Sequence, residues 1–315
     1  MHIVLGARVK NQSAVQHMID TSIDHVVYEA EPGLENASDQ IDAEFIGYGN
    51  FFNLDFYKDI KVDKVINFRD QQKWLAIENK IATLNKLPQQ INLDTFDFYN
   101  YKSVQNDIVQ ELDIPVLETE ADKIIVKLDS GYSGGNGFKV VERENYIPST
   151  NEFIQRYIDI EYTLAIQAYA DAEGYIYPYC FHRMDYENNS PTYAQSPYFS
   201  KETNLITEYL SRLKTKVQIK DRLIFWQFIR ERNGKLYNLD FNCRPAGGFE
   251  TGTYDTLIGD CNILDCYISN KGMPQAITFN KQVQIAYKYK QQFGYAPIDK
   301  QVVSADSYTY EVCIL

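Results

Sequence analysis

The most informative part of this chain runs Ile124-Ile125-Val126-Lys127, then Gly131-Tyr132-Ser133-Gly134-Gly135-Asn136-Gly137, then Phe138-Lys139-Val140-Val141. An apolar β-type run brings a lysine to a turn with four glycines, and a second β-type run returns. Because glycine has no Cβ, the backbone N–H groups of such a turn can approach phosphate oxygens closely. The lysine adds a positive charge beside the same oxygens. The stretch therefore predicts a hairpin that binds an anion, although glycine-rich hairpins without a nucleotide are about as common.

Two familiar phosphate-binding motifs are excluded. The chain contains no G-x-x-x-x-G-K-[ST] motif, so a P-loop is not supported. The four glycines are not spaced as G-x-G-x-x-G, and a predicted strand rather than a helix follows them. A dinucleotide-binding turn therefore fails on its structural context.

A second hairpin is predicted further along the chain. Two aromatic and aliphatic runs, at 223–229 and 236–242, flank the turn Arg232-Asn233-Gly234-Lys235. An Asn-Gly pair between two such runs is typical of a tight β-turn. Side chains alternate between the two faces of a strand, so Asp240, Asn242 and Arg244 should share one face of the second strand.

The shared face of that second strand suits a metal ion and an anion. A carboxylate and an amide oxygen two residues apart, here Asp240 and Asn242, are ligands that Mg²⁺ prefers and shares with phosphates. Arg244 can hold a phosphate or a carboxylate through two parallel hydrogen bonds. For each residue taken singly, an edge strand with an ordinary polar solvent face is the more common role. The three together, followed by Pro-Ala-Gly-Gly, weigh against it.

Residues 1 to about 90 alternate short apolar runs with helical patterns. Residues 62–68 predict a strand, and residues 71–84 predict a helix with an apolar side made of Trp74, Leu75, Ile77, Ile81 and Leu84. The pattern is typical of a βα domain, in which loops at the carboxyl ends of strands form binding sites. Asp70 is a candidate for such a site, although a helix cap is the more common role.

Composition and charge restrict the class of function. The chain has 315 residues, enough for two or three subdomains, and no apolar run of roughly 18 residues, so no membrane-spanning helix is expected. A net charge of −12 argues against nucleic acid and anionic membranes as partners. Five cysteines without a C-x-x-C pair, and an N-terminus without a signal-peptide core, predict reduced thiols in the cytoplasm.

The motifs together resemble the ATP-grasp superfamily of carboxylate–amine ligases, because they occur in that superfamily's order over roughly residues 95–270. Tyr101-Lys102-Ser103, followed by Leu112-Asp113-Ile114-Pro115, is similar to the family segment whose lysine binds nucleotide phosphates. Lys127 matches the family's second phosphate lysine. The family's glycine-rich lid is matched by Ser133, Gly134, Gly135 and Gly137.

Two further segments carry the resemblance. Residues 154–163 are similar to the family's hinge, which implies that Gln155 and Tyr157 lie near the adenine and that Glu161 binds the ribose hydroxyls. The run Asp240-Phe241-Asn242-Cys243-Arg244-Pro245 is similar to the metal motif E-x-N-x-R-P, with aspartate in place of glutamate. The family's other metal carboxylate would fall at Gln227, whose amide oxygen can bind Mg²⁺ but brings no charge.

The resemblance implies an α/β (α+β) ATP-grasp fold. Its parts would be a Rossmann-like pre-ATP-grasp domain at 1–95, a small lid at 96–158 and a larger antiparallel-sheet domain at 159–315. A helix is expected to begin at Lys102 and to end before Ile114. The polar stretch 185–200 is predicted to be a long loop.

The implied activity is the ATP-dependent joining of a carboxylate to an amine through an acyl phosphate, with release of ADP and phosphate. ATP and Mg²⁺, or Mn²⁺, are the implied cofactors. Lys127 would neutralise charge on the transferring phosphoryl group, and Arg244 would stabilise the oxyanion. Lys102, Lys127 and the lid would bind the phosphates, and Asp240, Asn242 and Gln227 the metal.

The expected partners are small-molecule carboxylate and amine substrates, with no nucleic acid and no membrane, and a homodimer is one assembly that the chain allows. Two alternative functions stay open. An ATP-grasp phosphotransferase would leave a stable phosphorylated product. A nucleotide-binding protein without catalysis is favoured by Gln227 at the metal-carboxylate position.

Overall fold

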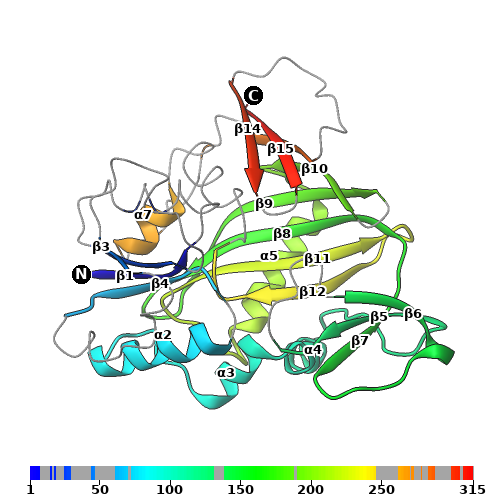
Figure 1. Cartoon of the computed structure of the whole chain (residues 1–315), viewed down its shortest axis with the longest axis horizontal. Helices are drawn as coiled ribbons and strands as arrows, with labels where there is room; N and C mark the ends of the chain where they lie inside the picture. The colour runs from blue at the N-terminus through cyan, green and yellow to red at the C-terminus, as the bar shows by residue number, and fades with distance from the viewer. Residues whose placement is uncertain are drawn as a thin grey trace.

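In the computed structural model, the described residues form three β-sheets (Figure 1). The structure describes residues 1–7, 15, 18, 25–29, 44–46, 61–69, 72–130, 138–187, 190–245, 262–269, 271–272, 278, 283–287, 299–305 and 308–314. The strands at 25–29, 44–46, 283–287, 299–305 and 308–314 are described by their backbone alone. Among these ranges, no helix combines the length and the apolar character needed to cross a membrane.

The N-terminal sheet is parallel, with the strand order β3 (Glu44–Ile46), β2 (His25–Glu29), β1 (His2–Ala7) and β4 (Lys64–Asn67). Helix α2 (Gln72–Asn85) packs beside β4 and β1, and its buried Trp74 and Ile81 form an apolar cluster with Leu5. The strand and the helix predicted at 62–68 and 71–84 are confirmed, but Leu84, predicted on the apolar side of the helix, is 51% exposed. Asp70 lies outside the described residues.

The small sheet has the strand order β6 (Phe138–Glu142), β5 (Lys123–Leu128) and β7 (Glu152–Arg156), and β5 pairs antiparallel with both neighbours. A short 3₁₀ helix, η4 (Arg143–Asn145), follows β6. The hairpin predicted from the apolar runs on either side of the glycines is confirmed. Its turn, with Ser133, Gly134, Gly135 and Gly137, lies outside the described residues.

The large sheet has the strand order β12 (Leu236–Asn242), β11 (Arg222–Glu231), β8 (Ile160–Ala170), β9 (Ile176–Glu187), β10 (Ser190–Ser196), β13 (Val283–Tyr287), β15 (Tyr308–Ile314) and β14 (Asp299–Ala305). All neighbouring strands pair antiparallel. The second predicted hairpin is confirmed as β11 and β12. The prediction of a long loop at 185–200 is wrong. Most of this polar segment forms strand β10, whose backbone pairs with both β9 and β13.

One face of the large sheet carries the main hydrophobic core. Leu164 and Ile166 of β8 pack there with buried residues of α3 (Leu93–Asn100), α4 (Lys102–Glu111) and α5 (Lys201–Leu213). Helix α4 begins at Lys102 and ends before Ile114, as predicted. Its buried Val109, however, belongs to the core of the large sheet, although the sequence had placed this helix with the small lid. Side chains alternate along a strand, so odd-numbered residues of β8 lie on the opposite face.

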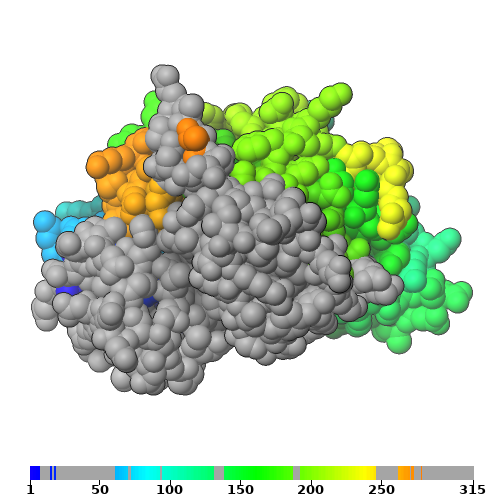
Figure 2. Space-filling view, turned by 90° about the horizontal axis from the view of Figure 1, so that it is seen from above, coloured from blue at the N-terminus to red at the C-terminus, as the bar shows by residue number. Residues whose placement is uncertain are grey.

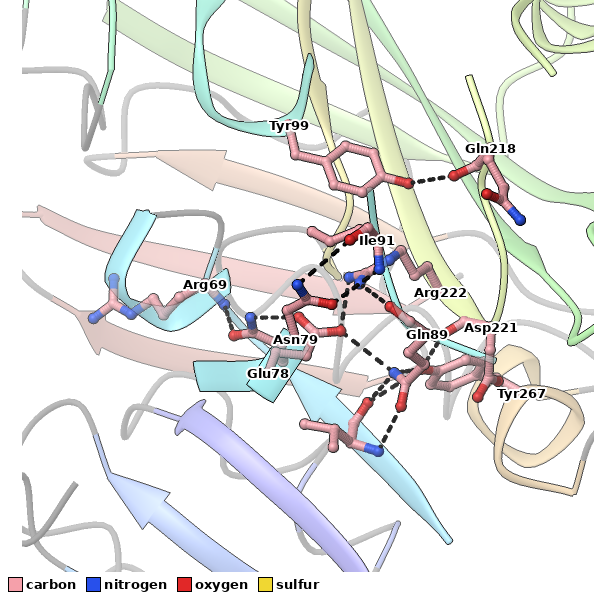
Figure 3. A network of polar contacts seen from close by, with 12 residues as sticks. Arg69, Glu78, Asn79, Gln89, Ile91, Tyr99, Gln218, Asp221, Arg222 and Tyr267 are labelled. Carbon is pink, nitrogen blue, oxygen red and sulfur yellow. Dashed lines mark hydrogen bonds and ion pairs between the residues drawn. The ribbon is translucent and has the colours of Figure 1, made fainter. Parts of the chain in front are cut away.

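A set of buried polar contacts, here called the polar seam, joins the N-terminal unit to the large sheet (Figure 3). The N-terminal unit is the parallel sheet together with helix α2. Lys64 of β4 lies 2.6 Å from the Asp221 carboxylate, and Arg222 of β11 lies 2.7 Å from the Glu78 carboxylate of α2. All four side chains are almost fully buried. Burial raises the pKa of the Glu78 carboxyl, and the positive charge of Arg222 opposes that shift.

Neutral groups complete the seam. Arg222 Nη2 donates to the Gln89 carbonyl at 2.9 Å, and Gln89 donates in turn to the Val65 carbonyl. Tyr267 of α7 (Ile263–Ile268) donates its hydroxyl proton to the Asp221 carbonyl at 3.0 Å. In the space-filling view, the surface of α7 (orange) adjoins that of the N-terminal unit (light blue) (Figure 2). The N-terminal unit, α7 and β11 are thus held as one block.

We expect Arg222→Met to lower the free energy of unfolding by about 3–5 kcal/mol, because it leaves the Glu78 carboxylate buried and unpaired. The double variant Glu78→Leu/Arg222→Met should recover a large part of that loss, since it leaves no unpaired charge. Urea denaturation near neutral pH measures both values. A double variant as unstable as Arg222→Met alone would contradict this explanation.

Candidate active site

Charged side chains from helix α4 and from the small sheet lie close to Asp240 of β12, which belongs to the large sheet. Lys102, at the first position of α4, has its Nζ 3.9 Å from Asp240 Oδ1. Lys127 of β5 is close enough for the Asp240 carboxylate to act on its pKa. Gln227 of β11 pairs directly with Asp240 in the strand register. The sequence prediction that Lys102, Lys127, Gln227 and Asp240 form one site is therefore consistent with the geometry.

Lys127 has a pKa well below the usual range of a lysine. Burial lowers the pKa of its ammonium to about 8; the Asp240 carboxylate opposes the shift, and the nearby Lys102 ammonium adds to it. Lys127 Nζ donates to Gln155 Oε1 of β7 at 2.9 Å. The buried Gln155 amide thus orients the lysine, whereas the family resemblance had implied only a place near the adenine.

Asp240, Asn242 and Arg244 are linked along one side of β12, as the alternation predicted. Arg244 Nη2 donates to Asn242 Oδ1 at 3.2 Å, and Nη1 donates to the Pro245 carbonyl at 2.8 Å. Asn242 Nδ2 lies 3.4 Å from Asp240 Oδ2. Arg244 is therefore turned toward one of the oxygens that the metal motif requires, Asn242 Oδ1.

The donor set fits one hard cation that is completed by phosphate oxygens. Asp240 offers a partly exposed carboxylate, and Asn242 and Gln227 offer neutral amide oxygens on the same face of the sheet. Within the described residues, no cluster of three His, Cys, Asp or Glu side chains could hold a metal by itself. Because Mg²⁺ usually keeps several non-protein ligands and shares oxygen with phosphates, these three residues suit it.

Helix α4 is fixed by two contacts that sequence reasoning missed. Asp129, just after β5, accepts hydrogen bonds from the Ser103 N–H and the Ser103 hydroxyl, both at 2.7 Å. Gln105 exchanges two hydrogen bonds with the backbone of Phe241, at 2.9 and 3.2 Å. The first contact ties α4 to the small sheet and the second ties it to β12. No local pattern marks either partner, because each lies far away along the chain.

A third contact ties the small sheet to the large one at the other end. Arg156 of β7 makes a bidentate pair with Glu231 of β11 at 2.8 and 3.0 Å, and it also donates to the Tyr237 hydroxyl at 2.8 Å. Bidentate pairs of this kind fix geometry as well as charge. Arg156 stands in the predicted hinge, but its partner 75 residues later gives no sequence signal.

The contacts described for Tyr157 and Glu161, the other two hinge residues of the prediction, are with residues outside the Asp240 cluster. The Tyr157 ring has Lys123 Nζ 4.6 Å from its centroid. Glu161 accepts from Arg230 Nε at 3.0 Å, and its side chain is 36% exposed. A ribose-binding role for Glu161 and an adenine-binding role for Tyr157 stay predictions.

No protein-family model and no curated protein sequence matches the chain. Solved structures do match it over nearly its whole length. N5-carboxyaminoimidazole synthetase from Staphylococcus aureus, complexed with ADP, is 11% identical with a TM-score of 0.74, covering 100% of this chain and 93% of that one. L-amino acid ligase from Bacillus licheniformis is 12% identical with a TM-score of 0.73, covering 99% and 92%.

A third similar structure is the biotin carboxylase domain dimer of 2-oxoglutarate carboxylase from Hydrogenobacter thermophilus, in complex with MgADP, ADP and bicarbonate. It is 12% identical, with a TM-score of 0.71, and the match covers 99% of this chain and 85% of that one. Likeness at such low identity establishes the fold.

We expect the affinity for ATP to fall by about tenfold between pH 7 and pH 9, because Lys127 loses its proton above pH 8 while a bound phosphate requires the charged form. Lys127→Arg keeps its charge throughout this range, so its affinity should stay nearly constant. Titration calorimetry at each pH measures both proteins. Equal pH profiles for the two proteins would remove Lys127 from the phosphate site.

Proposed function

We propose that this chain, which has the ATP-grasp fold, is an ATP-dependent ligase that joins a carboxylate to an amine through an acyl phosphate. The substrates would be small amino-acid or peptide-like molecules, and ADP and phosphate would be released. The observation that carries the proposal is the meeting of Lys102, Lys127 and Asp240, brought from a helix and two different sheets. The ligase and carboxylase neighbours support the same kind of reaction.

The residues would divide the work between phosphate binding and carbonyl activation. Lys102 and Lys127 would bind the phosphates of ATP, and their charge would stabilise the phosphoryl group during its transfer to the substrate carboxylate. Arg244, held beside Asn242, would donate to the oxyanion that forms when the amine attacks the acyl carbon. Mg²⁺, bound by Asp240, Asn242 and Gln227, would supply further charge neutralisation on the phosphates.

A second candidate function rests on Gln227. Its position opposite Asp240 leaves a single carboxylate in the metal set, and a nucleotide-binding protein without turnover needs no more than that. The cytoplasmic location and the homodimer stay predictions for either function.

We expect Lys127→Ala and Asp240→Ala each to lower ATP-dependent turnover at least tenfold while the fold is retained. The first removes a phosphate cation, and the second removes the metal carboxylate. ADP formation with mixtures of amino acids and dipeptides, followed by mass spectrometry of the product, measures this. Lys139→Ala is the matched control, since Lys139 lies on the same small sheet but is exposed and paired with Glu152. Unchanged turnover in both site variants would overturn the assignment.

We expect Gln227→Glu to tighten the binding of Mn²⁺ and Mg²⁺ in the presence of ADP, because it places a second carboxylate directly opposite Asp240. Metal titration by calorimetry measures the binding, and the rate of ADP formation is followed in parallel. A catalytic site should also change its rate or metal preference. Absence of turnover in both the parent and the variant would favour the nucleotide-binding function.

A further inference from the structure

Gln167 of β8 lies on the face of the large sheet that carries the Asp240 cluster. The strand register aligns Asp240 with Gln227, Ala165 and then His182 across four strands. The next row on the same face aligns Asn242, Phe225, Gln167 and Cys180. Adjacent strands lie about 4.8 Å apart, so Gln167 is two strands, or about 10 Å, from Asn242. That span suits a molecule of amino-acid size.

The side-chain amide of Gln167 has an unused donor. The residue is 3% exposed, and its Nε2 has no hydrogen-bond partner within the described part of the chain. It faces away from the main core, to which its neighbours Ile166 and Ala168 belong. Buried polar groups in folded proteins almost always find a partner, because leaving one unsatisfied costs free energy. An oxygen acceptor from a bound molecule would satisfy this donor.

The described side chains next to Gln167 on this face of the sheet are uncharged. The rings of Phe225 and His182 lie 6.5 Å apart between centroids, in neighbouring rows on either side of the small Ala165. Burial lowers the pKa of His182 to about 3, so its ring is neutral near pH 7. Cys180 Sγ lies 3.0 Å from Ser196 Oγ. A neutral amide donor among uncharged side chains can orient an oxygen through a hydrogen bond without forming an ion pair.

One row beyond Gln167, at Tyr169, aromatic rings cover the same face of the sheet. Tyr169, the next odd-numbered residue of β8, donates its hydroxyl proton to the Lys271 carbonyl. Its ring stacks on Tyr177 with a centroid separation of 4.9 Å and lies 6.3 Å from the ring of Tyr267. Gln167 is therefore the last polar position on β8 between the Asp240 row and this aromatic closure.

We propose that Gln167 binds the carboxylate-bearing substrate, with Nε2 donating to an oxygen of its carboxylate or carbonyl group. The proposal rests on the ligase function given above and names the residue that would set the distance between this substrate and the phosphates at Asp240 and Asn242. An ammonium group offers no acceptor, so this atom does not bind the amino group of either substrate.

Gln167→Leu tests the proposal, because leucine is similar in size and removes the donor without adding a charge. Melting temperatures are measured with no ligand, with MgADP, and with MgADP plus the proteinogenic L-amino acids as the probe. In the parent protein, both additions should raise the melting temperature. In Gln167→Leu, the MgADP shift should remain and the amino-acid shift should be lost, with at least about a tenfold fall in affinity by calorimetry. Gln110→Leu, at an exposed position of α4, is the control.

The protein without ligand separates a binding role from a structural one. If Gln167 binds substrate, Gln167→Leu should melt no lower than the parent, since it removes an unsatisfied buried group. Gln167→Glu keeps the size but repels a carboxylate, so it should also lose the amino-acid shift. An amino-acid shift that persists in Gln167→Leu, or that is absent from the parent, would overturn the proposal.

Failure of this inference and failure of the ligase function give different results. Amino-acid binding that depends on Gln167, without ADP formation, would keep the binding site and reject the reaction. ADP formation that is equal in the parent and in Gln167→Leu would keep the reaction and reject the role of Gln167.

Discussion

Two like charges, Lys102 and Lys127, are held beside a single carboxylate, and the rest of the site depends on that arrangement. Their repulsion has to be opposed by the fold. Asp129 ties helix α4 to the small sheet, and Gln105 ties the same helix to β12. Arg156 closes the other end through Glu231. The lysines can therefore remain close together without a ligand, and a polyphosphate bound as proposed would relieve the repulsion.

The local charge of this site is opposite to that of the whole chain. The protein carries a net charge of −12, whereas two cations, Lys102 and Lys127, lie beside Asp240. An anionic nucleotide is therefore attracted only at short range, where salt screens least. Gln227, directly opposite Asp240, adds no negative charge, so Asp240 is the carboxylate that opposes the positive field of the two lysines there. The chain thus combines a negative net charge with a small local cluster of cations.

The N-terminal unit is held rigidly against the large sheet by buried ion pairs, whose charges cost free energy to remove from water. Lys64–Asp221 and Glu78–Arg222 are closed off from water, so each charge depends on its partner. These pairs fix where α7 and the start of β11 lie. The odd-numbered face of β8 is closed beside them, at Tyr169. A rigid closure at this end and an unsatisfied amide at Gln167 bound the short stretch of sheet where the proposed substrate would bind.

Local sequence patterns were enough to define the two hairpins, helix α2 and helix α4, because alternation, glycine turns and helical periodicity act over a few residues. They also predicted Lys127 as a site residue and a shared face for Asp240, Asn242 and Arg244, because these motifs are short and local in the sequence. The polar strand β10 could not be predicted, because pairing with β9 and β13 stabilises it. Likewise, Asp129, Gln105, Arg156 and Gln167 acquire their importance from partners or rows that belong to other strands. Such contacts join residues separated by tens of positions, and only the folded packing brings them within hydrogen-bonding distance.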